Sequence, residues 1–437
     1  KTLLVFQVIF GRILKVGIYL TSLSIKGVIS MKQVEVAKKR NLVFVGHHGS
    51  GKTSLIESIL YYTGVTERLG RVDDGNTFSD YLDEEKDKKI TISSKLLHCS
   101  YKGHEINIID TPGYSDFLGE IKGAIHAADG AVLVINAQSG VEVETEKVWN
   151  FLNEYGLPRV VVINKMDKEH ADFDKCLTSL ETILKASVCP VRMPLGKESD
   201  FKGVIDLVAN KVLTFDAKGA VAKTDEIPAD LMDEVEEYRQ KMIERSVETD
   251  DSLMERYFAD EPISDDEIRG GLKTGAMAGN LVPVLVTSAT NCIGIPSLLD
   301  GLLNYLPDPL QRQTFKMIEP DAEETDEAIK EEGPGIGFVY KSSNDPFVGK
   351  ISLIRVFSGS FKGEMEWINR STGNKERVGH LLAMNGKTSS SIAHAGVGDI
   401  IAVTKVEGFD TNHTVSMEQG KKLVVPTKYP QPTVFQA

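Results

Sequence analysis

The sequence has few cysteines and no long apolar stretch, and both absences narrow what the protein can be. Four cysteines occur in 437 residues, at positions 99, 176, 189 and 292, and no two have CxxC spacing. This spacing argues against a zinc site or a disulfide framework and favours reduced thiols in the cytoplasm. Within the apolar residues 1–30, Arg12, Lys15 and Lys26 interrupt the sequence, so no uncharged run there reaches the roughly 18–20 residues that a membrane span requires. We therefore expect a cytoplasmic protein without a membrane segment.

Basic residues are fewer than acidic ones, 50 against 63. The net charge is −13, and the acids are concentrated in the middle of the chain. This balance argues against wrapping of nucleic acid, although a mildly basic part from residue 333 onward leaves a local RNA contact open. The length is sufficient for two to three domains. Residues 1–30 lack an initial Met and are apolar, so we interpret them as an upstream or disordered segment outside the fold.

A glycine-rich loop follows the first predicted strand. The segment GHHGSGKTS fits GxxxxGK[ST] and lies between a strand and a helix. Its glycines allow backbone N–H groups to face phosphate oxygens, while the lysine reaches the β/γ phosphates and the threonine holds Mg²⁺. The predicted phosphate-binding residues are Gly46, His47, His48, Gly49, Ser50, Gly51, Lys52, Thr53 and Ser54.

Two further loops predict that the base is guanine. The strand VVVIN ends in NKMD, and a carboxylate at Asp167 can accept hydrogen bonds from both N1–H and N2–H₂ of guanine, which adenine lacks. In the segment VLVTSAT, backbone N–H groups are candidates to bind guanine O6. The predicted base-reading residues are Asn164, Lys165, Met166, Asp167, Ser288 and Ala289.

A third motif, DTPG, lies between the phosphate loop and NKMD. Asp110 ends a predicted strand and can bind Mg²⁺ through water, and the Gly113 N–H can sense the γ-phosphate. Upstream, Thr91 is positioned to close over Mg²⁺ and the γ-phosphate, so Thr53, Thr91 and Asp110 form the predicted metal set. Residues 67–90 otherwise read as a solvated, charged loop. The DTPG residues that we assign to the GTP site are Asp110, Thr111, Pro112 and Gly113.

Hydrophobic periodicity predicts an α/β fold. Apolar strands alternate with helices, and a turn at Lys102-Gly103 makes the second and third strands a hairpin. We expect a doubly wound, mostly parallel sheet with its sites at the carboxyl ends of the strands. The predicted strands are 42–46, 92–101, 105–110, 130–136, 159–164 and 283–287, and the predicted helices are 52–62, 115–128, 142–155, 171–186 and 294–306.

In order and spacing, these motifs resemble those of the translational GTPases. The segment PVRMPLGKESDFKGVIDLV and the acidic insert after it resemble elongation factor G, and GHHGSGKTS with DTPGYSDF resembles its bacterial elongation factor G-like branch. The resemblance covers residues 40–437 and implies a monomer that acts on the ribosome, contacting ribosomal RNA and stalk proteins. It also implies three further domains beyond this chain, which carry translocation. GTP binding should survive in a fragment, whereas translocation should not.

The resemblance also implies a domain layout. Alternating apolar strands with glycine turns in the C-terminal part predict an antiparallel β-barrel by themselves. The eight acids and one lysine of residues 319–332 predict a solvated, flexible linker. We predict a GTP-binding domain at 31–315 with an inserted α+β subdomain at about 187–280, an acidic linker at 316–332, the barrel at 333–424, and a linker with the start of a third domain at 425–437.

Several positions depart from the family pattern. His48 replaces an apolar residue, Gly49 replaces an acid, and Lys88-Lys89 replace Arg-Gly. Tyr114 stands where the principal members have a His that positions the attacking water. Tyrosine can still donate or accept one hydrogen bond, but it cannot become a cation at pH 7. Because positioning and electrostatics dominate phosphoryl transfer, we expect slower hydrolysis unless a partner compensates.

Two roles for Tyr114 remain open at this point: positioning of water, or packing under a mobile loop. The resemblance assigns catalysis to Tyr114, Lys52 and Gly113. Three functions also remain open. The preferred one is a ribosome-acting GTPase with GTP/GDP and Mg²⁺ as ligands. The second is a ribosome-binding GTP switch with little or no turnover, and the third is a relative of ribosome-protection or release-factor GTPases.

Overall fold

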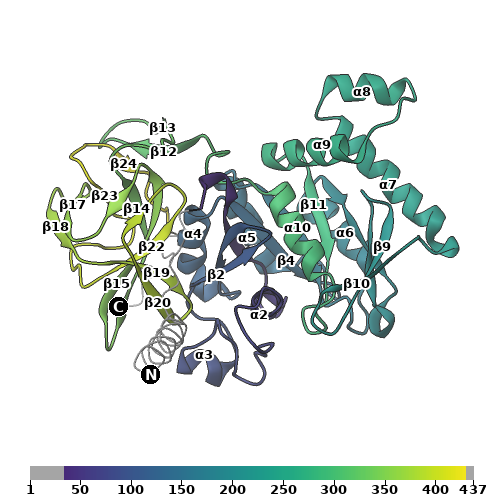
Figure 1. Cartoon of the computed structure of the whole chain (residues 1–437), viewed down its shortest axis with the longest axis horizontal. Coiled ribbons are helices and arrows are strands. Elements are labelled where there is room, and N and C mark those ends of the chain that lie inside the picture. Colours follow the sequence, from purple (N-terminus) through teal and green to yellow (C-terminus); the bar gives the residue numbers. More distant parts are fainter. Residues whose placement is uncertain (1–33, 430–437) are drawn as a thin grey trace, which may run out of the picture.

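The computed structural model describes residues 34–429, and its largest sheet matches the predicted α/β fold. Seven strands lie in the order β2-β3-β1-β4-β5-β11-β6, and all neighbours are parallel except the β2–β3 hairpin (Figure 1). The predicted doubly wound, mostly parallel sheet is therefore confirmed. The strands are β1 (Lys39–Val45), β2 (Lys95–Tyr101), β3 (His104–Asp110), β4 (Gly130–Asn136), β5 (Arg159–Asn164), β6 (Val188–Pro190) and β11 (Val282–Val286).

Helices cover this sheet. Helix α10 lies beside α2, and α4 lies beside α5. All residues of β1 and β5 are buried, as expected for strands covered on both faces. These helices are α2 (Lys52–Tyr62), α4 (Leu118–Ala127), α5 (Val143–Glu154), α6 (Phe173–Ile183) and α10 (Ile295–Tyr305).

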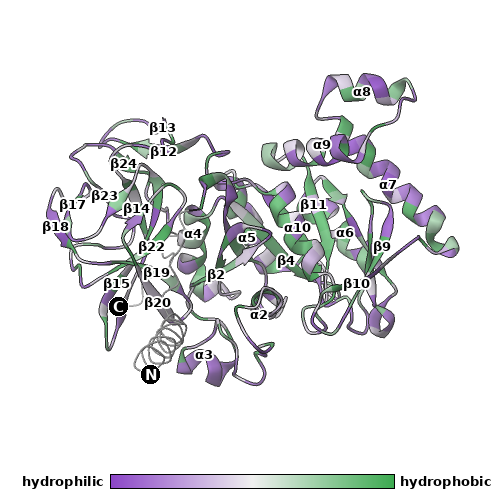
Figure 2. Cartoon of the chain, in the orientation of Figure 1, coloured by the Kyte–Doolittle hydropathy of each residue, from purple (hydrophilic) through white to green (hydrophobic). Residues whose placement is uncertain are grey.

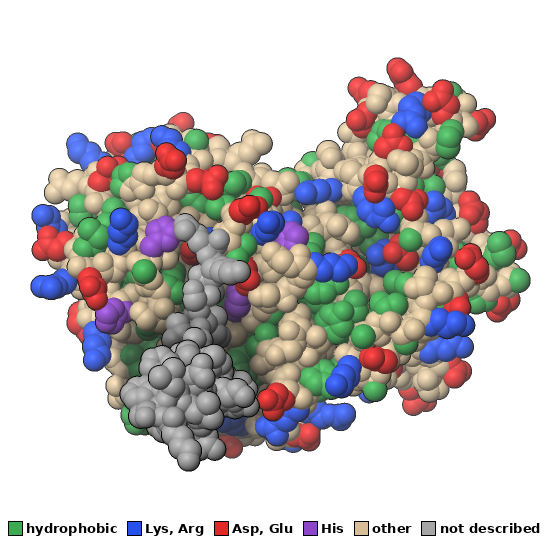
Figure 3. Space-filling view, viewed as in Figure 1, with side chains coloured by type: hydrophobic (Ala, Val, Ile, Leu, Met, Phe, Trp, Pro, Cys, Tyr) green, Lys and Arg blue, Asp and Glu red, His purple; other side chains and the backbone are tan. Residues whose placement is uncertain are grey.

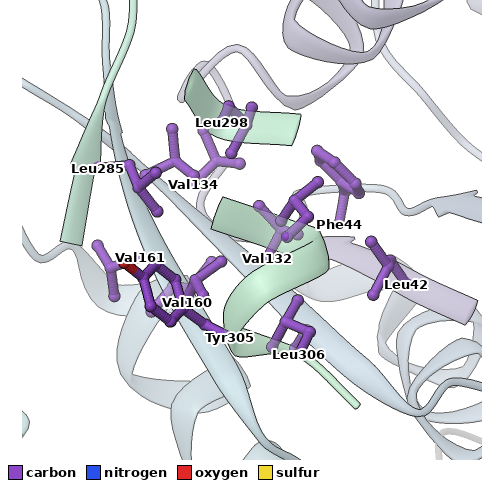
Figure 4. Packing of buried hydrophobic residues seen from close by; sticks show 14 of the residues in the cluster. Leu42, Phe44, Val132, Val134, Val160, Val161, Leu285, Leu298, Tyr305 and Leu306 are labelled. Carbon is purple, nitrogen blue, oxygen red and sulfur yellow. The ribbon is translucent and has the colours of Figure 1, made fainter. Parts of the chain in front are cut away.

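The main core includes apolar side chains of the sheet and of the helices that cover it. Figure 4 shows the part where residues of β1, β4, β5 and β11 approach α10, and its labelled residues are at most 1% exposed. The β-branched runs VVVI and AVLVI explain why these segments form central strands, since such side chains pack well on a pleated surface. The labelled residues of this core include Leu42, Phe44, Val132, Val134, Val161, Leu285, Leu298 and Tyr305.

The predicted insert forms a smaller α+β unit beside the main sheet. Its four strands lie in the order β10-β9-β8-β7, and α7, α8 and α9 extend from one end of the molecule (Figure 1). Acidic side chains gather around α8 (Figure 3). β6 lies within the range expected for the insert, yet it pairs with β11 as a seventh strand of the main sheet. The elements are β7 (Arg192–Leu195), β8 (Gly203–Asp206), β9 (Lys211–Phe215), β10 (Val221–Asp225), α7 (Met232–Val247), α8 (Asp251–Phe258) and α9 (Asp265–Ala278).

The C-terminal part is an antiparallel β-structure with its own core around Trp367, Phe361 and Phe409. Eight strands lie in the order β18-β17-β23-β14-β15-β22-β19-β20, so the sheet is an open barrel. β16 (Phe361–Lys362) and β21 (His394–Ala395) form a separate pair. The eight strands are β14 (Ile336–Asp345), β15 (Gly349–Ser358), β17 (Met365–Asn369), β18 (Lys375–Val378), β19 (Leu381–Asn385), β20 (Thr388–Ile392), β22 (Ile400–Thr404) and β23 (Thr414–Ser416).

Two acidic segments contain more secondary structure than their composition indicates. The expected flexible linker contains strand β13 (Thr325–Ala328), which pairs with β12 (Thr314–Ile318), and β12 pairs with β24 (Leu423–Val424). Cross-strand pairing with β12 orders this segment although its side chains are mostly exposed, and Lys316 and Asp326 form an exposed ion pair at 2.8 Å. Within the expected charged loop 67–90, the short helix α3 (Asp83–Lys88) forms. Its hydrophilic residues contrast with the hydrophobic strands β4 and β11 (Figure 2).

Within residues 34–429, the structure contains no helix that is long and apolar enough to span a membrane. The interpretation of residues 1–30, and the end of the segment 425–437, fall outside the described residues. The boundaries between domains stay predictions.

The barrel packs on the main domain through apolar contacts, such as Phe338 and Phe357 against His126, and through polar ones. Asp129, 2% exposed, accepts hydrogen bonds from Arg355 at 2.9 Å to each carboxylate oxygen and from Asn41 at 2.8 Å. At β2, the N–H of Gly386 donates to the Leu96 carbonyl at 2.8 Å. The contacts therefore join the barrel both to the middle and to one side of the sheet.

Candidate nucleotide-binding site

The phosphate loop connects β1 to α2, and its glycines are required by geometry. Gly46 has φ of +143°, and a Cβ there would lie 2.2 Å from the carbonyl oxygen of Val134. Gly51, the N-cap of α2, has φ of +90°. Lys52 donates to the carbonyls of Gly46 at 2.9 Å and His47 at 3.0 Å. Burial lowers the pKa of the Lys52 ammonium to about 8. The loop therefore holds one buried cation at the start of a helix, a favourable place for anions.

The three predicted metal ligands meet although they come from distant parts of the chain. The Thr53 hydroxyl lies 3.0 Å from the Thr91 hydroxyl and donates to Asp110 Oδ2 at 3.0 Å. Ser79, which sequence reasoning missed, also donates to Asp110 Oδ2, at 2.8 Å. Asp110 Oδ1 is buried without a hydrogen-bond partner. Burial raises the pKa of Asp110.

Asp80 is a second buried acid at this place, and sequence reasoning missed it. The residue is 3% exposed, and neither carboxylate oxygen has a hydrogen-bond partner. Burial, together with the charges of Asp110 and Glu85, raises the pKa of Asp80 to about 7. The only sequence signal was the acid-rich run before Ile-Thr-Ile, which is equally typical of a solvated loop.

The donor set fits Mg²⁺. Hydroxyl and carboxylate oxygens are the ligands that this hard cation prefers. Asp80 and Asp110 together leave three buried carboxylate oxygens without partners, and a nearby divalent cation would satisfy them. The segment that carries Ser79 and Asp80 is held from α2, because Glu57 accepts the N–H groups of Phe78 at 2.8 Å and Ser79 at 2.9 Å.

The DTPG segment lies directly against the phosphate loop. Thr111 donates to the Phe44 carbonyl at 2.6 Å, and Pro112 beside it is also buried. A Cβ on Gly113 would lie 2.6 Å from Lys52 Nζ and 2.7 Å from the His48 backbone N, so only glycine allows this approach. The Tyr114 ring then stacks on the His48 ring. The glycine therefore brings the backbone close to the phosphate loop, and Tyr114 is directed onto its second histidine.

Asn164 connects the three loops. Its Nδ2 donates to the Ser50 carbonyl at 3.1 Å, and its Oδ1 accepts from the Thr287 hydroxyl at 3.2 Å and the Ala289 N–H at 3.1 Å. The Ser288 N–H donates to the Ile293 carbonyl. Both N–H groups have partners within the chain in this structure, and the expectation that Ser288 and Ala289 offer them to guanine O6 stays a prediction.

The remaining predicted base-reading residues are Lys165, Met166 and Asp167. Asp167 Oδ2 lies 3.0 Å from Lys168 Nζ and accepts from Thr290 at 3.4 Å, whereas its buried Oδ1 has no partner. Lys165 has φ of +68°, and Met166 is 1% exposed and packs in the core. Asp167 thus retains an acceptor that a base N–H could use.

The remaining predicted residues also lie in the phosphate loop or at the start of α2. His47 faces Glu142 and Glu144, Gly49 has φ of +73°, and Ser54 is in the first turn of α2. The structure therefore brings the predicted residues together at the carboxyl ends of β1, β3, β5 and β11, while their roles stay predictions.

Comparisons with known proteins identify the family. The model of the elongation factor Tu GTP binding domain matches residues 37–308, and that of elongation factor G domain 2 matches residues 334–432. A crystal structure of a protein from Thermus thermophilus is similar, with 32% sequence identity and a TM-score of 0.79. The match covers 90% of this chain but 57% of that one, so the chain spans a little over half of that protein's length. The chain therefore belongs to the elongation factor Tu-type GTP-binding family and is a translational GTPase of the elongation factor G type.

Proposed function

We propose that this chain binds GTP together with Mg²⁺ and hydrolyses it to GDP and phosphate while acting on the ribosome. The observation that carries the proposal is the meeting of Thr53, Thr91 and Asp110 beside the buried Lys52, at hydrogen-bond distances. Phosphate and cation chemistry need these residue types within a few ångströms of one another.

Each residue has a distinct task in this proposal. Lys52 binds the β/γ phosphates, and the Gly113 N–H donates to the γ-phosphate. Thr53, Thr91 and Asp110 hold Mg²⁺, with Asp80 beside them. When bound, the cation neutralises charge on the phosphate oxygens. Asp167 accepts from the guanine base through its unpartnered oxygen.

Tyr114 takes the place of the water-positioning residue. Its hydroxyl can hold one water by a hydrogen bond, but the ring cannot supply the positive charge that an imidazole can. We expect intrinsic hydrolysis to be slow and the ribosome to stimulate it. The proposed partners are ribosomal RNA at the barrel and stalk proteins at the acidic insert, bound by a cytoplasmic monomer.

The first test is GTP hydrolysis by the full-length protein with and without ribosomes, beside Tyr114→His and Lys52→Ala. Strong stimulation of the wild type supports a working ribosomal GTPase. Lys52→Ala should abolish nucleotide binding, because it removes the buried ammonium that faces the phosphates. Retained GTP affinity in Lys52→Ala would contradict the site assignment.

One observation supports a second candidate function, a GTP-dependent ribosome binder with little turnover. The phenol of Tyr114 is stacked rather than free, and it cannot become cationic. If ribosomes do not stimulate the wild type but Tyr114→His gains activity, the tyrosine is a brake, and the protein is better described as a GTP-dependent ribosome binder.

A further inference from the structure

Two aromatic rings from different loops contact each other beside the nucleotide site. The ring centroids of Tyr114 and His48 are 4.3 Å apart, and the ring planes differ by 16°. Tyr114 follows the DTPG segment, and His48 belongs to the phosphate loop. Stacked aromatic pairs contribute free energy beyond the burial of their area. The contact therefore links the two loops physically.

His48 is itself supported from behind. Its ring lies 4.0 Å from the His47 ring at 42°. The Nε2 atom of His47 is 3.4 Å from Glu142, and its Nδ1 faces Glu144. Glu142 is the N-cap of α5 and forms a capping box there. A continuous series of contacts thus runs from Tyr114 through both histidines to the start of α5.

The residues on either side of Tyr114 are also restrained. A Cβ on Gly113 would lie 2.7 Å from the His48 Cα, so the backbone has little room to move closer. Ser115 donates to Glu144 at 3.1 Å and accepts from Lys147 at 2.8 Å. With both neighbours fixed, the main freedom left to Tyr114 is the orientation of its side chain.

We propose that His48 is a positioning residue that sets the orientation of Tyr114, so that the two rings act as one unit in GTP hydrolysis. This inference rests on the proposed function, because the orientation of Tyr114 matters through the rate of that reaction. An aliphatic side chain at position 48 would remove the flat surface on which the phenol lies. The substitutions at 48 and 114 therefore depend on each other rather than adding independently.

The first experiment is a double-mutant cycle on single-turnover GTP hydrolysis by the full chain. The variants are His48→Ala, Tyr114→Leu and their combination, with His48→Phe as the rescue that keeps a flat ring. We expect His48→Ala to change the rate by about two- to tenfold, a slowing that follows from loss of one stacked pair. His48→Phe should restore the rate, because it keeps a flat ring against the phenol.

In the Tyr114→Leu background, His48→Ala should have no further effect on the rate. The matched control is His380→Ala, because the His380 side chain is 70% exposed in the barrel. An equal slowing by His48→Ala in both backgrounds would overturn the proposal, as would failure of His48→Phe to restore the rate.

A second experiment uses NMR to detect the stacking of Tyr114 on His48 and does not depend on GTP hydrolysis. In ¹³C-histidine-labelled protein, the ring current of Tyr114 should shift the carbon-bound imidazole protons of His48 upfield. Tyr114→Leu should remove this shift, and Tyr114→Phe should retain it. If the wild type turns over no GTP, the proposed function fails, while this spectrum still decides whether the pair exists. Unchanged His48 signals in Tyr114→Leu would refute the stack.

Discussion

Two buried acidic sites in this molecule differ in how their oxygens are satisfied. At the barrel interface, both oxygens of Asp129 accept hydrogen bonds from Arg355, and Asn41 adds a third donor. At the nucleotide site, Asp80 and Asp110 are equally buried, yet three of their four oxygens have no partner. The same side chain is thus a completed structural contact in one place and an unused acceptor in the other.

The difference separates a structural site from a binding site. Unpaired buried carboxylates are unfavourable, and proteins keep them mainly where a ligand compensates. Within residues 34–429, the acids with a buried oxygen that lacks a hydrogen-bond partner belong to the phosphate loop's surroundings or the base-reading loop. They are Glu57, Asp80, Asp110 and Asp167, together with Glu144, whose oxygen faces Nδ1 of His47.

The largest expected effect follows a substitution of Asp129 at the barrel interface. Asp129→Asn leaves the Arg355 guanidinium, 1% exposed, without its charge partner. Removing one member of a buried pair costs about 3–5 kcal/mol, so urea unfolding of the full chain should show a loss of that order. Asp326→Asn, at an exposed ion pair, is the control and should cause no measurable loss. A small effect at Asp129 would mean that this contact is not structural.

The next prediction concerns the unused oxygen of the base-reading loop. Asp167→Asn replaces an acceptor by an amide that can donate, so GTP affinity should fall at least about a hundredfold, or about 2.7 kcal/mol. The affinity for XTP should rise, because its exocyclic oxygen can accept a hydrogen bond from the amide. Competition titrations against labelled GDP measure both, with Glu169→Gln as the control at an 82% exposed side chain. Unchanged GTP-over-XTP selectivity would contradict the base-reading role.

A smaller effect concerns the pH dependence of stability, which tests the burial of His126 at the barrel interface. Burial, with a contribution from Arg312, lowers the pKa of His126 to about 3. Tyr155 lies 5.3 Å away, and Thr427 is the hydrogen-bond partner at 3.0 Å. The unfolded chain takes up this proton near pH 6.5 and the folded chain only near 3, so stability falls as pH drops between these values.

At pH 5 we expect the free energy of unfolding to be about 2 kcal/mol lower than at pH 7 because of His126. Urea unfolding at both pH values measures it, and His126→Gln should reduce the difference by that amount. An identical pH dependence in His126→Gln would show that the residue is not buried in its neutral form.

The smallest expected effect concerns the unpartnered acid beside the metal set. Asp80→Asn should raise the Mg²⁺ concentration needed to retain GDP by about tenfold, because it removes a charge next to the cation. EDTA-triggered release of labelled GDP at fixed free Mg²⁺ measures this without hydrolysis. Asp83→Asn, at a 95% exposed side chain, is the matched control. Equal Mg²⁺ dependence in both variants would show that Asp80 does not act on the cation.

The sequence could predict the parts of the site that each loop carries locally. GxxxxGK[ST], DTPG and NKMD each combine special backbone geometry with a defined side chain, and the strands before them have strong apolar periodicity. Thr53, Thr91 and Asp110 meet as expected. The parallel sheet explains this agreement, because it brings the ends of its strands to one edge.

The remainder depended on contacts between distant segments. Asp80 read as part of a solvated run, because its burial follows from Glu57 holding the neighbouring backbone. Asn164 stays a predicted base-reading residue, and the local motif did not indicate that its amide also joins the neighbouring loops. The strands of the acidic segment could not be predicted, because the pairing of β12 with β24, about a hundred residues later, cannot be read from local composition.

The contact of the barrel with β2 has a consequence for solubility. β2 is the outermost strand at one end of the main sheet, and such a strand offers unpaired backbone groups to other chains. Gly386 donates to Leu96, and the Asn385 side chain bonds both backbone groups of His98 at 3.0 and 3.2 Å. The barrel thereby covers this edge strand and limits edge-to-edge pairing with other chains. A GTP-binding domain produced without the barrel should therefore aggregate more readily.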